Sequence, residues 1–181
     1  HGSLQELVNV TGGAEEVYMT IQPSDDIYAL DVIEETQNYF KDNPDIQCFG
    51  YKQGYVIDYT TGKIAYWRPT TTPPFYTIRF KREVFIDPLK HVKYIGPYKS
   101  HEYVKDFLKA DYIEKKGFLV GTHGDNISTI FNHPYTVQLE NESIEEIRSK
   151  FGLDNIESFS SSSSLFFSLS VFCWVFCLHF N

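Results

Sequence analysis

The sequence predicts an α/β fold in which a mixed sheet is flanked by helices. Segments rich in β-branched and aromatic residues alternate with segments whose apolar residues recur at helical spacing. The chain has 181 residues, of which 42% are hydrophobic and 17% aromatic, enough for one core but short for two domains. We therefore expect one domain over residues 1–157, followed by a tail of different character over residues 158–181.

The first elements are a strand and a helix. Glu16–Ile21 is β-branched and aromatic and is followed by Pro23, which favours a buried strand that ends there. Ser24-Asp25-Asp26 then predicts the start of a helix that runs to about Phe40, before Asn43-Pro44 stops it. The acidic pair is thus expected between a strand end and a helix start.

The middle of the chain predicts mainly strands. Tyr55–Tyr59 and Lys63–Trp67 flank a short polar segment that contains Gly62, a pattern typical of a β-hairpin. Phe75–Phe80 and Glu83–Ile86 are expected to be two further strands.

The last predicted elements are two helices and a strand. Apolar residues at helical spacing predict a helix over Glu102–Glu114, and Phe118–Thr122 predicts a strand. Ser143–Phe151 predicts a short helix, because Ser143 and Glu146 have the spacing of a capping box.

The charge balance restricts the partners. Sixteen basic and twenty-four acidic residues give a net charge of −8, which repels phosphate and argues against binding of nucleic acid or anionic lipid. A ligand that carries phosphate would need a metal ion or a local cluster of donors to offset this charge.

The tail is rich in serine and then apolar. Leu165–Phe180 is slightly shorter than the about 20 residues that usually span a bilayer. Three interpretations remain open: a non-native extension, membrane association, or a packed terminal helix or strand. The chain is accordingly expected to be cytoplasmic or membrane-associated.

Asp25 and Asp26 are the most informative candidates for chemistry. Two carboxylates at the end of a strand can bind a hard divalent cation, which in turn can hold a diphosphate. The alternative is helix capping, since aspartate in a first turn binds free backbone N–H groups and suits the helix dipole.

The segment Val17–Tyr28 resembles the metal-binding strand end of glycosyltransferases with the A-type fold, in particular family 2 enzymes and rhamnosyltransferase-like proteins. In these proteins a buried strand ends in Asp-(Ala/Ser)-Asp-Asp and a helix begins. The similarity covers about residues 14–135 and includes the hairpin, the segment Phe75–Arg79, Tyr94–Tyr98 and the acidic helix start at Glu102. Pro23 departs from the pattern, because the first acidic residue of the family would stand there.

The resemblance implies metal-dependent transfer of a sugar from a nucleoside-diphosphate donor to a hydroxyl of a glycan or another acceptor. Asp25 and Asp26 would bind Mn²⁺ or Mg²⁺, and His123 would complete the metal or diphosphate site. Ser24, Asp26 and Gly124 would contact the donor. For His123, the alternative is an ordinary surface or core histidine.

The resemblance also implies a catalytic base that takes the proton of the acceptor hydroxyl. Glu102 is the candidate and Asp106, one turn later, is the second choice; the alternative for both is a carboxylate at a helix start. Only twenty-four residues precede Asp25. We therefore expect the carboxyl-terminal half of an A-type domain, which can be inactive alone. The rival interpretation is a non-catalytic α+β module with a structural role or a role in surface interactions. One form of this interpretation includes a membrane anchor.

Overall fold

A computed structural model describes Asn9, residues 11–23, 25–87, 101–123 and 129–154, and the backbone of residues 173–178. The secondary-structure elements in chain order are β1 (Glu16–Gln22), β2 (Ile27–Tyr28), α2 (Val32–Asp42), β3 (Cys48–Asp58), β4 (Ile64–Trp67), β5 (Tyr76–Lys81), α3 (Arg82–Phe85), η1 (His101–Tyr103), α5 (Val104–Phe107), β6 (Ala110–Thr122), β7 (Thr136–Val137), α6 (Ile144–Lys150) and β8 (Cys173–Leu178).

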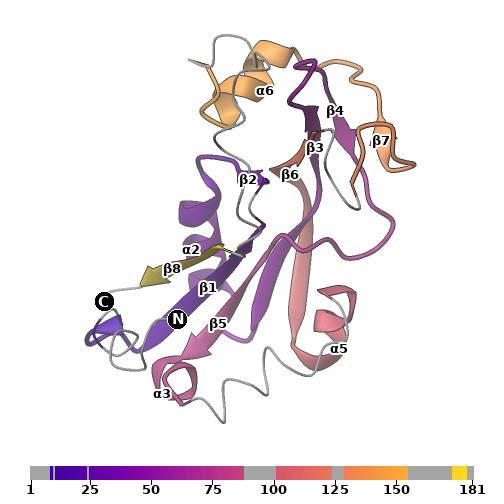
Figure 1. Cartoon of the computed structure of the whole chain (residues 1–181). Coiled ribbons are helices and arrows are strands. Elements are labelled where there is room, and N and C mark those ends of the chain that lie inside the picture. The colour runs from indigo at the N-terminus through magenta and orange to yellow at the C-terminus, as the bar shows by residue number, and fades with distance from the viewer. Residues whose placement is uncertain are drawn as a thin grey trace.

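The strands of the described residues form one mixed sheet with the order β2-β6-β3-β5-β1-β8; outside this order, β4 pairs with β3 and β7 pairs with β4 (Figure 1). Strand β5 is antiparallel to both β1 and β3, and β6 is parallel to β3. Strands β1, β3 and β6 therefore run in the same direction. The predicted α/β class with a mixed sheet is confirmed, with many strands and few helices.

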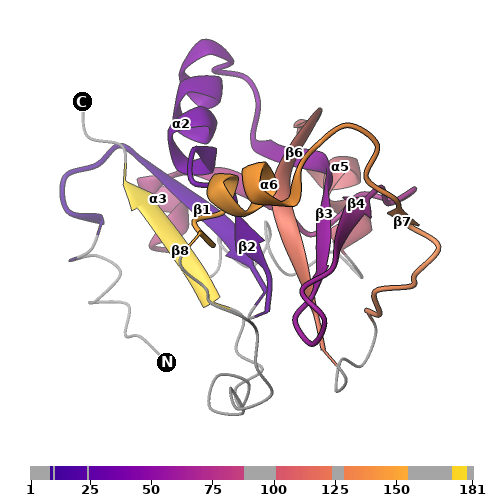
Figure 2. The ribbon, with the colours of Figure 1, turned by 90° about the horizontal axis from the view of Figure 1, so that it is seen from above.

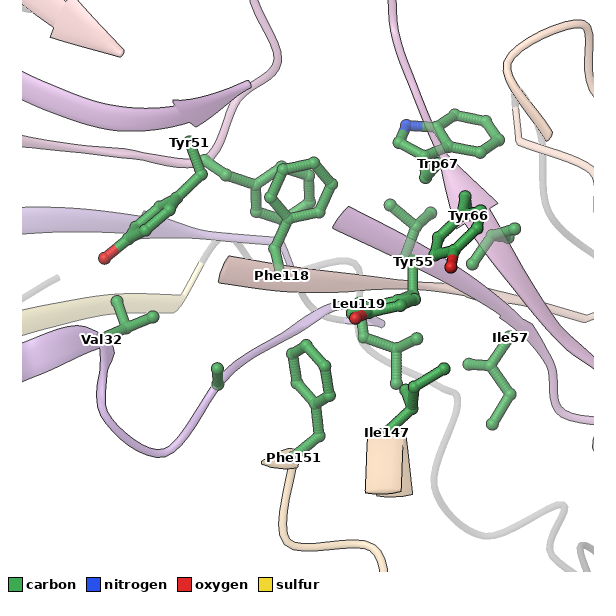
Figure 3. Packing of buried hydrophobic residues seen from close by; sticks show 14 of the residues in the cluster. Val32, Tyr51, Tyr55, Ile57, Tyr66, Trp67, Phe118, Leu119, Ile147 and Phe151 are labelled. Atoms are coloured by element: carbon green, nitrogen blue, oxygen red, sulfur yellow. The ribbon is translucent and has the colours of Figure 1, made fainter. Parts of the chain in front are cut away.

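Buried side chains lie on both faces of the sheet. One core cluster contains Phe40 of α2 and Ile147 of α6, and a second contains Phe85 of α3 and Val104 of α5. Figure 2 shows how these helices lie around the strands. In the first cluster, Ile147 of α6 and Phe151, directly after α6, point towards the sheet, and the rings of Phe151 and Tyr55 have centroids 5.8 Å apart (Figure 3).

The predicted hairpin is confirmed as β3 and β4, which pair from Gly54↔Trp67 to Ile57↔Ile64. Asp58 organises the turn, because its carboxylate accepts hydrogen bonds from the Thr60 N–H at 2.8 Å and the Thr61 hydroxyl at 2.7 Å. Gly62 has a φ of +69°, which favours glycine. The strands predicted at Glu16–Ile21 and Phe75–Phe80 are confirmed as β1 and β5.

The helix predicted from Ser24 to Phe40 begins later than expected. Ile27 and Tyr28 form β2 and pair with Leu119 and Phe118 of β6, so α2 starts only at Val32. The Tyr28 hydroxyl also donates to the Ile21 carbonyl oxygen at 2.7 Å. Pairing with a distant strand here overrides the local helical spacing.

Two other predicted elements are wrong. Residues 83–86, expected as a strand, lie mostly within the short helix α3. The helix predicted over Glu102–Glu114 is replaced by η1 and α5, after which β6 begins at Ala110. The reason is parallel pairing with β3, in which Ala110 lies opposite Cys48 and Tyr112 opposite Gly50. The predicted strand Phe118–Thr122 is the carboxyl-terminal part of β6.

The predicted capping box of α6 is confirmed. The Ser143 hydroxyl accepts a hydrogen bond from the Glu146 N–H, and the Glu146 carboxylate accepts one from the Ser143 N–H, both at 3.1 Å. We expect Ser143→Ala to lower the free energy of unfolding by about 1 kcal/mol in urea denaturation. Ser149→Ala, an exposed change in the same helix, is the control. Equal stabilities of the two variants would contradict a capping role for Ser143.

Most of the tail lies outside the described residues. The backbone of its strand β8 pairs antiparallel with β1, from Val17↔Leu178 to Gln22↔Cys173. Among the residues that the structure describes, none of the helices has both the length and the apolar character needed to cross a membrane.

Candidate functional site

The parallel strands β1, β3 and β6 end at the same edge of the sheet, here called the carboxyl edge (Figure 1). Asp25 and Asp26 follow β1, Tyr59 follows β3, and His123 follows β6. In open α/β sheets, ligands bind at the carboxyl ends of parallel strands. Together with Gly121 of β6, these residues form what we call the Asp25–Asp26 site.

Asp26 is bound to strand β6 through its side chain. It is only 8% exposed, and its Oδ1 accepts a hydrogen bond from the Gly121 N–H at 2.9 Å. The N-cap residue of α2 is Asp31, so neither Asp25 nor Asp26 caps that helix. The helix-capping interpretation of the acidic pair is therefore wrong.

The environment of Asp26 favours its neutral form. Burial, and then the negative charge of Asp25, raise the pKa of Asp26 to about 7, although the hydrogen bond from Gly121 acts in the opposite direction. Burial prevails because the side chain is almost completely removed from water. A cation bound beside Asp26 would compensate the charge and stabilise the ionised form.

Tyr59 connects Asp25 to the ends of two strands. Its hydroxyl donates a hydrogen bond to the main-chain carbonyl oxygen of Asp25 at 3.2 Å, and its N–H donates to the Thr122 carbonyl oxygen at 2.9 Å. Burial, followed by the charges of Asp26 and Asp25, raises the pKa of Tyr59 to about 12, so the hydroxyl stays protonated at neutral pH.

Gly121 allows the close packing of this site. A Cβ atom at position 121 would lie 2.1 Å from the Asp25 carbonyl oxygen and 2.4 Å from Cε2 of Tyr59. Sequence reasoning missed Tyr59, since aromatic residues of a hairpin usually form core or cross-strand pairs. The one signal for it was its position directly after Asp58, at the end of a predicted strand.

Glu102 and Asp106 lie away from the carboxyl edge. They belong to η1 and α5, and α5 precedes β6 at its amino-terminal end (Figure 1). His101 Nδ1 lies 2.8 Å from the Thr72 carbonyl oxygen, in the loop between β4 and β5. The two ends of the 13-residue strand β6 are about 40 Å apart at the usual rise per residue of a strand. The structure therefore brings Asp25 and Asp26 close to the strand end that leads to His123, but not Glu102 or Asp106.

The remaining predicted residues, Ser24 and Gly124, lie outside the described residues. Within the part of the chain that is described, no group of three or more His, Cys, Asp or Glu side chains is arranged to hold a metal ion. Two neighbouring carboxylates nevertheless fit a hard cation such as Mg²⁺, which is commonly held by one or two carboxylates together with phosphates of the substrate.

A separate cavity of about 410 Å³ lies between α2 and β6. Half of its lining residues are acidic; the lining consists of Asp31, Glu34, Glu35, Asn38, Tyr39, Asp42, Ile113 and Lys115. Lys115 forms ion pairs with Asp31 at 2.7 Å and with Glu35 at 3.0 Å. Because the lining is acidic and its lysine is paired, this cavity is unsuited to a diphosphate.

Comparison with protein-family models, curated proteins and solved structures finds no match to this chain.

Proposed function

We propose that this chain is part of a glycosyltransferase that transfers a sugar from a nucleoside-diphosphate donor to an acceptor hydroxyl. In this proposal the Asp25–Asp26 site binds the Mn²⁺ or Mg²⁺ that holds the donor diphosphate. The supporting observation is that the acidic pair and the strand that leads to His123 meet at the carboxyl edge of parallel strands.

The charges support a cation at this position. With a net charge of −8, the chain needs a local positive charge to bind a diphosphate. Asp25 is the principal ligand and Asp26 adds negative charge from its buried position. His123 follows β6 at the same edge of the sheet, but the described side chains of Asp25, Asp26 and His123 do not form a three-ligand metal group. When bound, the cation stabilises the negative charge of the leaving diphosphate.

The proposed reaction also needs a base for the acceptor hydroxyl. Glu102 and Asp106 remain candidates for the base only as a sequence-based prediction, because their segment lies away from the carboxyl edge. We therefore assign the Asp25–Asp26 site to binding of the cation and the diphosphate, and assign no residue as the base.

Titration with Mn²⁺ in the presence of inorganic pyrophosphate, followed by electron paramagnetic resonance, tests the proposal. We expect Asp25→Asn to weaken Mn²⁺ binding by about tenfold or more, because a charged oxygen ligand becomes neutral. Asp45→Asn is the matched control, since the Asp45 side chain is 85% exposed. The proposal fails if the unaltered chain does not bind Mn²⁺, or if the two variants bind it equally well.

One observation favours a second candidate, a non-catalytic interaction module. The hydrogen bond from the Gly121 N–H to Asp26 joins the β1–β2 connection to β6, which is a structural role for an acidic residue. An Asp26 with this role alone would hold the fold together without binding a cation. The Mn²⁺ titration distinguishes the two functions, because only the glycosyltransferase requires binding that depends on Asp25.

A further inference from the structure

We propose that Tyr59 is a positioning residue that sets the direction of the Asp25 carboxylate towards the cation. This inference rests on the proposed function. Tyr59 acts through the main chain, because its hydroxyl donates to the carbonyl oxygen of Asp25 and not to the carboxylate. A hydrogen bond at this atom fixes the peptide plane from which the Asp25 side chain projects.

The tyrosine is itself held firmly. Its N–H binds the Thr122 carbonyl oxygen at 2.9 Å, which ties the end of β3 to the end of β6. Its ring also lies against Gly121, where a Cβ atom would come within 2.4 Å of Cε2. The ring therefore has a fixed position on the sheet, from which the hydroxyl reaches the β1–β2 connection.

The two aspartates are held in complementary ways. Asp26 is bound through its carboxylate to the Gly121 N–H at 2.9 Å, and Asp25 is bound through its carbonyl oxygen to Tyr59 at 3.2 Å. Tyr59 therefore holds Asp25 through its main chain. Groups that orient a metal ligand without touching the metal commonly change metal affinity by about 10- to 100-fold.

Tyr59→Phe tests the inference, because it removes only the hydroxyl. We expect Mn²⁺ binding in the presence of inorganic pyrophosphate to weaken about tenfold, the effect of losing one orienting hydrogen bond. The resonance spectrum of the bound Mn²⁺ should also change, which a loss of stability alone would not cause.

Tyr55→Phe is the matched control. It removes a hydroxyl from β3, the strand that Tyr59 follows, and this hydroxyl donates to the Glu142 carboxylate and not to Asp25. Urea denaturation of both variants measures the cost in stability, and only Tyr59→Phe should alter Mn²⁺ affinity at equal stability. Equal affinities of Tyr59→Phe and the unaltered chain would overturn the positioning role and leave the proposed function standing. An unaltered chain that binds no Mn²⁺ would overturn both.

Discussion

Gly121→Ala is expected to destabilise the fold by about 3 kcal/mol and to abolish Mn²⁺ binding. The added Cβ would lie 2.1 Å from the Asp25 carbonyl oxygen, a backbone atom that cannot rotate away. The β1–β2 connection would therefore move, and with it the hydrogen bonds that Asp25 and Asp26 make with Tyr59 and Gly121. Urea denaturation followed by circular dichroism measures the first effect, and Mn²⁺ titration the second.

Two other glycines serve as controls for this change. A Cβ at Gly13 would meet no atom within 4 Å, so Gly13→Ala should leave both stability and Mn²⁺ affinity nearly unchanged. A Cβ at Gly117, which lies away from the carboxyl edge, would be 2.4 Å from the Tyr51 ring. Gly117→Ala should therefore lower the stability of the fold. If Gly121→Ala retains Mn²⁺ binding, the described packing of Asp25 against β6 is wrong.

Asp26→Asn should remove a pH dependence of stability. The pKa of Asp26 is raised from 3.8 to about 7 in the folded protein, so the folded state binds the proton more tightly than the unfolded chain. This contribution is fully present below pH 3.8 and is lost as the pH rises through about 7. Between these limits the free energy of unfolding should fall by up to about 4 kcal/mol.

Asparagine resembles the protonated aspartic acid and still offers an oxygen to the Gly121 N–H. The variant should therefore match the unaltered chain near pH 4 and exceed it in stability by several kcal/mol, of the order of 4 kcal/mol, near pH 8. Urea denaturation at a series of pH values measures the difference, and Asp45→Asn controls for the loss of one exposed charge. Parallel stability curves for Asp26→Asn and the unaltered chain would show that burial does not raise the pKa of Asp26.

The same variant has opposite effects on stability and on binding. Removing the charge of Asp26 relieves the cost of burying a carboxylate, but it also removes negative charge next to the proposed cation. A residue that lowers the stability of the fold at neutral pH is easier to understand if its charge has a use in binding. A gain in stability together with a loss of Mn²⁺ affinity would be the result expected for a functional aspartate.

Features set by neighbouring residues could be predicted from the sequence. The β3–β4 hairpin depends on a turn in which Asp58 and Gly62 lie four residues apart. The capping box of α6 depends on Ser143 and Glu146. The strand β1 follows from a β-branched and aromatic segment that ends before Pro23, and this also located the acidic pair at a strand end.

Features that depend on distant residues could not be predicted in this way. Residues 110–114 belong to a segment whose apolar side chains predict a helix, but they form a strand because they pair in parallel with β3. Ile27 and Tyr28 also lie in a segment that predicts a helix, but they form a strand that pairs with β6. For this reason Asp26 is buried against Gly121 and does not cap a helix.

Local chemistry thus determined the turns, the helix cap and the presence of Asp25 and Asp26 after a strand, because these depend on contacts within a few residues. The tertiary structure alone decided the burial and raised pKa of Asp26, its link to Gly121 and the contact of Tyr59 with Asp25. These contacts join residues that are far apart in the chain, and their energy comes from strand pairing and from removal of water. The spacing of residue types along the sequence does not reveal this strand pairing or this removal of water.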